Sequence, residues 1–181
     1  MDREVILSCA CGQVALRITG RHIVSVECCC TSCRAAGDIL GALPMAKPPV
    51  DDKGATRYVM QRKDHVKLLR GGEQLREFRL APDSKTRRVV AVCCNTPILA
   101  EFQGGHWFSL YGSIWPVGTL PPLELRTMCG DLPAGTQLPN DVTNARTHTF
   151  KFYAQLFAAW VGMGFRAPRF DVVKGALNVP R

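Results

Sequence analysis

The clustering of cysteines is the feature that most constrains how this chain can fold. Nine cysteines occur in 181 residues, and six of them lie within the first 33. A Cys-x-Cys motif is followed by a Cys-x-Cys-x-x-Cys motif, an adjacent pair and a lone residue: Cys9 and Cys11, Cys28, Cys30 and Cys33 with Cys29 between them, Cys93-Cys94, and Cys129. An odd count with these spacings is typical of metal-binding thiolates rather than of a disulfide framework, and zinc is the expected metal.

The remaining composition predicts a chain that keeps these thiols reduced. The first residues do not resemble a signal peptide, and no apolar run is long enough to cross a membrane. We therefore expect a cytoplasmic protein without a membrane partner, in which clustered cysteines serve metals or catalysis. Apolar residues make up 46% of the chain, enough for a hydrophobic core without disulfides.

The net charge of +8 comes from 23 basic and 15 acidic residues. The basic residues are scattered, with no dense run and no basic helix. This pattern favours a soluble basic surface over a nucleic-acid-binding one. The charge also suits an anionic small molecule.

Alternating apolar and polar residues predict a mainly β protein over the first two-thirds of the chain. β-branched residues support strands in several segments: 5–7, 13–18, 22–28, 66–69, 75–80, 88–92 and 98–102. Gly71-Gly72 predicts a hairpin turn between two of these strands, and residues 44–52 predict a loop.

The C-terminal part has a helical pattern instead. Apolar residues on two faces predict a helix over residues 147–163, capped by Asn144 or Thr147 and ended by Gly162 or Gly164. A helix that is apolar all round is a buried one. We expect it to pack on the β domain or in a homodimer interface, which divides the chain into a domain at 1–125 and an extension at 126–181.

The two cysteine motifs predict different metal sites. Cys9 and Cys11 point the same way in an extended chain and need partners from elsewhere. Cys28, Cys30 and Cys33 supply three thiolates from one strand end and a short turn. Catalytic zinc usually has three protein ligands and an open position, whereas a fourth protein ligand would make the site structural. The spacing alone leaves both alternatives open.

Three ordered motifs resemble the glutathione-dependent formaldehyde-activating enzyme family, which includes centromere protein V. They are Ser8-Cys9-Ala10-Cys11-Gly12-Gln13-Val14, Cys28-x-Cys30-x-x-Cys33-Arg34 and Cys94-Asn95-Thr96-Pro97-Ile98, within about residues 5 to 110. The resemblance implies a β-tent of antiparallel sheets around zinc. It implies a structural zinc held by the Cys-x-Cys and a later Cys-x-x-Cys-Gly, and a second zinc on Cys28, Cys30 and Cys33. The implied activity is a carbon–sulfur lyase that interconverts S-hydroxymethylglutathione with glutathione and formaldehyde.

The third motif departs from the family pattern. Ala91 stands where the first cysteine of Cys-x-x-Cys is expected, and Asn95 replaces the glycine, although asparagine tolerates left-handed backbone. Cys93 is the candidate for the missing ligand, provided that the chain turns there, since neighbouring strand residues point to opposite faces. The chain resembles a branch of the family that carries this Cys-Cys-Asn-Thr-Pro form.

Several residues outside the ligand cysteines are further candidates for a site. Arg34 follows Cys33 and is a candidate to bind a substrate carboxylate or to balance the charge of the thiolates. Cys29 is expected to point away from the metal, and Cys129 to be inert. Of the four histidines, His106 is the best candidate for a pocket.

Two functional hypotheses follow. The first is a zinc-dependent carbon–sulfur lyase acting on a small thiol or a thiol–aldehyde adduct, with Cys28, Cys30, Cys33 and Arg34 at the reactive centre. In this hypothesis Cys9, Cys11, Cys93 and Cys94 hold a structural zinc. The alternative is a non-catalytic zinc-binding module that binds a protein or nucleic-acid partner. An open three-thiolate site facing a pocket favours the enzyme, and a closed four-ligand site favours the module.

Overall fold

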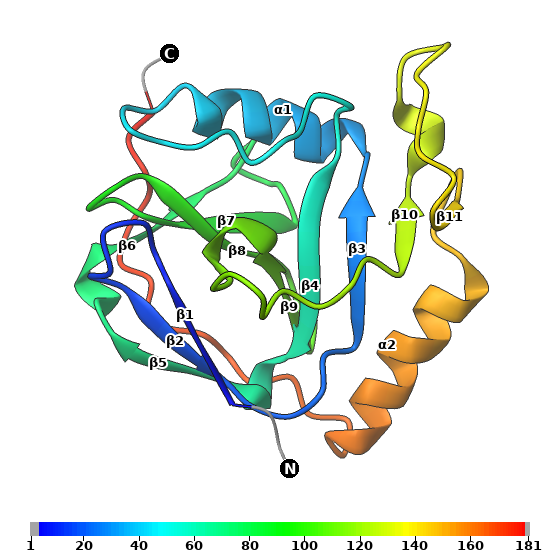
Figure 1. Ribbon diagram of the computed structural model, residues 1–181. Coiled ribbons are helices and arrows are strands. Elements are labelled where there is room, and N and C mark those ends of the chain that lie inside the picture. Colours follow the sequence, from blue (N-terminus) through cyan, green and yellow to red (C-terminus); the bar gives the residue numbers. More distant parts are fainter. Residues whose placement is uncertain (1–3, 180–181) are drawn as a thin grey trace.

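Two β-sheets form the framework of the computed structural model, which describes residues 4–179 (Figure 1). A three-stranded antiparallel sheet has the order β1 (Val5–Ser8), β2 (Ala15–Ile18), β5 (Val66–Arg70). An eight-stranded sheet has the order β11 (Thr143–Asn144), β10 (Leu125–Thr127), β3 (Val24–Cys28), β4 (Thr56–Arg62), β9 (Trp107–Tyr111), β8 (Thr96–Phe102), β7 (Thr86–Ala91), β6 (Leu75–Phe78). Its pairs are antiparallel, except that β10 is parallel to β3 and β11. The predicted mainly β class is confirmed.

Two α-helices and four short 3-10 helices complete the fold. The α-helices are α1 (Thr31–Gly41) and α2 (Phe150–Gly162), and the 3-10 helices are η1 (Lys63–His65), η2 (Gly72–Gln74), η3 (Gly112–Ile114) and η4 (Cys129–Asp131). The sequence predicts a short turn at Cys33, and the structure has the helix α1 there instead. Cys30 begins the helix because its sulfur accepts the Cys33 N–H at 3.3 Å, as a capping side chain does.

The main core lies between the two sheets. Leu7 and Leu16 of the small sheet pack with Val89, Leu99 and Leu110 of the large one, all fully buried. The opposite face of the large sheet packs against α2, whose buried residues join side chains of β3, β4 and β8: Val26, Tyr58, Met60, Ala100, Phe152 and Leu156. The large sheet therefore has one face on the small sheet and the other beneath the C-terminal helix.

The predicted hairpin at Gly71-Gly72 is wrong. β5 pairs with β2 in the small sheet, and β6 pairs with β7 in the large sheet, so this turn carries the chain from one sheet to the other. Gly71 has φ +78°, and a Cβ there would lie 2.4 Å from the Gln13 carbonyl oxygen. The glycine is needed for this crossing because both the left-handed backbone and the close contact exclude a side chain.

The C-terminal helix is confirmed, but it is not buried on two faces. Phe152 and Leu156 pack on the sheet, whereas Phe150 and Phe157 are exposed, the first at 89% and the second at 58%. The cap is Thr149, whose hydroxyl accepts the Phe152 N–H at 3.1 Å, in place of the two expected residues. Within the described chain, the face of α2 that carries Phe152 and Leu156 is covered by the sheet. That a second subunit covers the exposed face stays a prediction.

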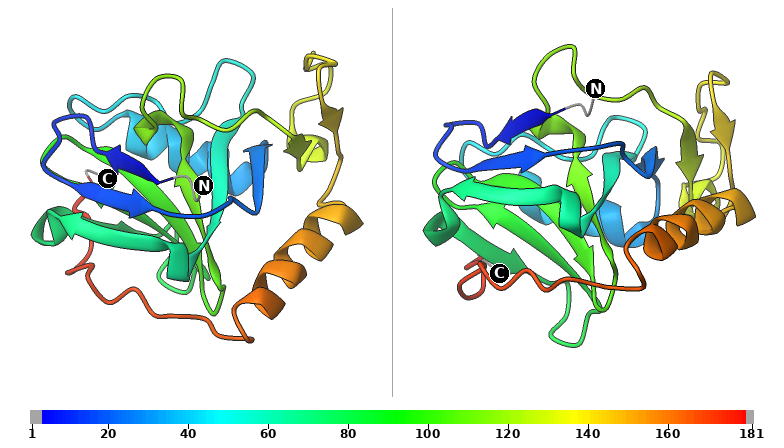
Figure 2. Two further views of the ribbon diagram at one scale, coloured as in Figure 1. Left: turned by 60° about the horizontal axis from the view of Figure 1, so that its bottom comes forward. Right: turned by 90° about the horizontal axis from the view of Figure 1, so that it is seen from below.

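The C-terminal part is bound into the large sheet. The boundary expected between residues 125 and 126 falls inside β10, which pairs with β3. Beyond α2 the chain runs back beneath the sheets to β6 (Figure 2), where the Glu77 N–H donates to the Gly175 carbonyl at 3.0 Å. No helix within residues 4–179 is both long and apolar enough to cross a membrane.

Candidate metal centres

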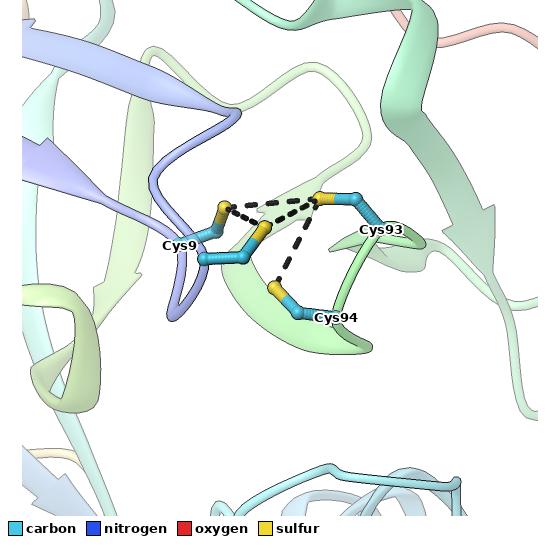
Figure 3. A group of neighbouring side chains, drawn as sticks. Cys9, Cys93 and Cys94 are labelled. Carbon is cyan, nitrogen blue, oxygen red and sulfur yellow. Dashed lines mark hydrogen bonds between the residues drawn. The ribbon is translucent and has the colours of Figure 1, made fainter.

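Four cysteines meet where two turns approach each other. Cys9 and Cys11 lie in the turn between β1 and β2, and Cys93 and Cys94 lie in the turn between β7 and β8 (Figure 3). The sulfur of Cys93 lies 3.8 Å from that of Cys9, 3.3 Å from that of Cys11 and 3.9 Å from that of Cys94. We call these residues the four-cysteine group.

The spacing of this group suits a metal ion with tetrahedral coordination. Sulfurs about 2.3 Å from a central zinc form a tetrahedron with edges of about 3.8 Å. All four sulfurs lie within 4.8 Å of one another, so they could hold one ion. Asn95 has a left-handed backbone with φ 51°, and the turn at this point lets adjacent cysteines face one centre. The grouping expected from the sequence is therefore present. Cys93 supplies the fourth sulfur, in place of the cysteine that the family pattern has at the position of Ala91.

The surroundings of the four-cysteine group favour one thiolate. Burial raises the pKa of Cys94, but hydrogen bonds, among them that of the Thr96 hydroxyl at 3.1 Å, lower it to about 6. Burial raises the pKa of Cys9 and of Cys93. Metal binding needs deprotonated cysteines, and an ion would take the place of the protons that the other thiols retain.

Three further cysteines meet where β3 ends and α1 begins. Cys28 is the last residue of β3, Cys30 caps α1 and Cys33 lies in the first helical turn. Their sulfurs lie within 4.8 Å of one another and could hold one ion, and no other described Cys, His, Asp or Glu joins this group. We call it the three-cysteine group. Cys29, between two of its members, is fully buried and lies outside both groups.

The surroundings of the three-cysteine group favour a thiolate at Cys30. Hydrogen bonds from the Cys28 and Cys33 thiols lower the pKa of Cys30 more than burial raises it, and the Cys33 N–H and the charge of Arg88 act in the same direction. The hydrogen bonds with Cys30 and Cys33 in turn raise the pKa of Cys28. A thiolate held at a helix N-terminus beside a cation is the form of cysteine that binds metals and reacts.

A cavity of about 350 Å³ opens beside the three-cysteine group. It lies between the large sheet and α2, with Cys28 and Cys33 in its wall. Most of the lining is apolar, as in small-molecule sites. A larger groove of about 770 Å³ runs along β7, β8 and the C-terminal segment, but no cysteine or histidine lines it. The cavity of about 350 Å³ therefore combines reactive cysteines with space for a ligand.

Three polar side chains that sequence reasoning missed lie in the same wall. The Tyr58 hydroxyl lies 3.9 Å from the Cys33 sulfur. His148 bonds through Nδ1 to the Thr127 hydroxyl at 2.8 Å, and burial lowers its pKa, which keeps the ring neutral at pH 7. Arg88 is 1% exposed and lines the cavity from β7.

Two of the expected site residues lie elsewhere. Arg34 does not line the cavity: its Nη2 donates to the Asp131 carbonyl at 2.7 Å, and the side chain faces a separate groove. His106 is bonded through Nε2 to the Leu156 carbonyl at 2.8 Å, where it holds α2 to the sheet. The structure thus brings together the seven expected ligand cysteines in two groups, but not Arg34 with them.

Comparison with known proteins gives a family but no function. Residues 1–113 match the family model described as a family of unknown function, DUF6151. No match was found among curated proteins. A crystal structure of a Rhodobacter sphaeroides protein is similar to this chain with 16% sequence identity and a TM-score of 0.45, over 64% of this chain and 91% of that one.

Proposed function

Because the chain belongs to the DUF6151 family, whose function is unknown, we propose a function from the candidate site itself. The protein is a zinc-dependent carbon–sulfur lyase that acts on thiol–aldehyde adducts such as S-hydroxymethylglutathione. The three-cysteine group holds the reactive zinc, and the four-cysteine group holds a structural one. One observation carries the proposal: the group with three ligands in the described chain is the one that faces an apolar cavity.

Cysteine chemistry supports zinc as the metal in both groups. Seven of the nine cysteines lie in the two groups, and all nine are free thiols in the structure. Sets of thiolates select zinc over magnesium, calcium and manganese. At the three-cysteine group a bound zinc would supply an electrophilic position for a substrate oxygen or sulfur. The proposal places the protein in a reducing compartment such as the cytoplasm, because oxidised cysteines would not bind the metal.

The reaction breaks the carbon–sulfur bond of a hydroxymethyl thioether. The hydroxyl loses its proton, the carbonyl forms, and the sulfur leaves as a thiolate that then takes up a proton. His148 suits the first proton transfer: when the Thr127 hydroxyl donates to the Thr147 carbonyl, at 3.4 Å, it can accept the Nδ1–H of His148. Nε2 is then unprotonated and can take the hydroxyl proton as a general base. The Tyr58 hydroxyl, beside Cys33, can donate a hydrogen bond to a sulfur at the same end of the cavity.

The second candidate function is a non-catalytic zinc module that binds a protein partner. The observation in its favour is the exposed aromatic side of α2, with Phe150, Tyr153 and Phe157 each more than half exposed. Contiguous exposed apolar surface of this kind often marks a binding site for another protein. This function would leave the cavity beside the three-cysteine group without a role.

Metal analysis and an exchange assay together test the proposed lyase. Protein made without chelator should contain two equivalents of zinc, and NMR exchange between free formaldehyde and its thiol adduct should be faster than the uncatalysed rate. Cys30→Ser should lose one zinc and the accelerated exchange. If both groups are loaded and no thiol shows accelerated exchange, the non-catalytic module is the better description.

A further inference from the structure

We propose that the cavity beside the three-cysteine group binds molecules with a single anionic group, and that Arg88 binds this group. The ligand's apolar body would lie beneath α2, and its carboxylate would lie close to the three cysteines. The inference deepens the proposed function and rests on it for the identity of the substrate as a thiol adduct. The binding of the anion itself depends only on Arg88 and the cavity.

Arg88 is a buried cation whose donors are only partly satisfied. Its Nη2 donates to the carbonyl and the hydroxyl of Ser32, both at 3.0 Å. Its Nε and Nη1 have no hydrogen-bond partner within the described chain. Unpaired donors of a buried charged group are costly, so such a group normally has an anion next to it.

Arg126 is a second buried arginine, and its ion pairs can be compared with the contacts of Arg88. Its side chain is also buried, and it pairs with Glu27 and with Asp141 at 2.6 Å each. No carboxylate of residues 4–179 forms such a pair with Arg88, although the two arginines lie in the same sheet. The difference leaves the free donors of Arg88 available to an anion from outside the chain, beside the charge of the cysteine thiolates.

The position of Arg88 fixes where that anion lies. Ser32, which accepts both hydrogen bonds from the guanidinium, is next to Cys33 in α1, and Cys33 and Arg88 line the same cavity. An oxygen bound by Arg88 is therefore close to a sulfur bound at the three-cysteine group. A carboxylate one or two bonds from the sulfur, as in a 2-mercapto carboxylic acid or a thiol adduct of a 2-oxo acid, matches this arrangement.

The rest of the cavity suits an uncharged body. Trp107 and Phe102 from the sheet and Phe152 and Leu156 from α2 are among the apolar side chains that line it. Arg88 is the one group with a permanent charge among the described lining residues. Glutathione carries two carboxylates and an ammonium group, so two of its three charges would have no partner in this lining. A monoanionic thiol with an apolar side chain is a better match.

Calorimetric titration of the zinc-loaded protein tests this assignment. The probes are 2-mercapto-3-phenylpropanoate, the neutral thiol with a methyl group in place of the carboxylate (1-phenylpropane-2-thiol), and 3-phenyllactate, which has the carboxylate but a hydroxyl in place of the thiol. We expect both carboxylates to bind. Arg88→Gln should weaken their binding about 10- to 100-fold, as expected for a lost hydrogen bond to a charged group. Binding of the neutral thiol should be unchanged, and the matched variant Arg34→Gln should bind all probes as the wild type does.

The outcomes separate this inference from the proposed function. Carboxylate binding that depends on Arg88, in a protein that does not accelerate adduct exchange, supports the inference and contradicts the lyase. Accelerated exchange with S-hydroxymethylglutathione, without any preference of the wild type for carboxylate probes, supports the lyase and overturns the inference. If Arg88→Gln loses zinc but still binds carboxylates, Arg88 only balances the thiolate charge, and the inference is wrong. If that variant fails to fold, the preference of the wild type for 2-mercapto-3-phenylpropanoate over the neutral thiol decides.

Discussion

The two cysteine groups use the same ligand chemistry in opposite surroundings. The four-cysteine group lies between two turns, and its four sulfurs form a set that already suits tetrahedral coordination. The three-cysteine group lies at a strand end and a helix start, and a cavity reaches two of its members. Ligand number and the adjoining space, rather than residue type, distinguish a site that holds a fold together from one that is open to a substrate.

The groups also differ in which parts of the chain they join. Cys9 and Cys93, from the small and the large sheet, are 84 positions apart. Cys28 and Cys33 lie in one local segment. A metal that closes a long loop between two sheets removes more freedom from the unfolded chain than one that closes a single turn. The four-cysteine group should therefore matter more for stability, and the three-cysteine group more for binding and chemistry.

Cys11→Ser should have the largest effect on stability. Removing one of four thiolates should release the metal that joins the two sheets, with a loss of at least about 4 kcal/mol of unfolding free energy. Chemical denaturation and elemental zinc analysis should show stability and metal content falling together. Cys129→Ser, which changes a half-buried cysteine outside both groups, is the control. Full zinc and an unchanged midpoint in Cys11→Ser would mean that this group is not a metal site.

Phe152→Ala should have the next largest effect on stability. It tests whether α2 forms a wall of the cavity beside the three-cysteine group. Phe152 is 4% exposed and stacks on His148 with ring centroids 4.6 Å apart, so its loss should cost about 3 kcal/mol or more. Both metals should be retained, while ligand binding in the cavity weakens. The matched control is Phe157→Ala on the exposed side of the same helix, for which a change within about 0.5 kcal/mol is expected. Equal losses in the two variants would contradict the packing of α2 described here.

Substitutions of Cys30 separate its capping role from its metal role. Serine can still accept the Cys33 N–H, whereas alanine cannot, so Cys30→Ala should be less stable than Cys30→Ser by about 1 kcal/mol. Both variants should lose the metal of the three-cysteine group and keep the other. A stability loss in Cys30→Ser as large as that in Cys11→Ser would remove the proposed difference between the groups.

Arg34→Ala should have the smallest effect. Its guanidinium bonds to a loop carbonyl and faces a groove on the other side of α1, so carboxylate binding in the cavity should stay within about twofold of the wild type. Calorimetry with 3-phenyllactate measures this directly. If Arg34→Ala weakened carboxylate binding as much as Arg88→Gln, Arg34 would bind the carboxylate, as its place next to Cys33 predicts.

Local sequence patterns predicted much of the secondary structure and the candidate ligands. Alternation in β1, β2, β7 and β8 predicted strands close to those found, and the apolar pattern after residue 147 predicted α2. The same patterns did not predict β4, β9, β10 or β11. They also missed α1, because Cys30 is an unusual capping residue. The cysteine spacings predicted the three-cysteine group and the Cys9 and Cys11 half of the four-cysteine group, because the members of each motif are close in the chain. That Cys93 and Cys94 join Cys9 and Cys11 was implied by the family resemblance.

Residues without a neighbouring motif could not be placed from the sequence. Arg88 and Thr86 occupy alternate positions of β7 and line the cavity together, but nothing in the sequence says that this face lies beneath α2. His148 follows no ligand spacing and reaches the cavity only because α2 packs on the sheet. In the sequence Arg88 ends a polar run that includes Lys85 and Arg87, directly before Val89 and Val90, and nothing distinguishes it from these neighbours.

The sequence by itself determined many of the strands, the C-terminal helix and the three-cysteine group, because these depend on residues near one another in the chain. The tertiary structure decided that Gly71 and Gly72 carry the chain between sheets, that Cys93 and Cys94 turn toward Cys9, and that Arg88 rather than Arg34 lies in the cavity. These outcomes depend on which strands pair and which faces are covered. Pairing and coverage are set by burial of the whole core, and the local sequence around each residue does not record them.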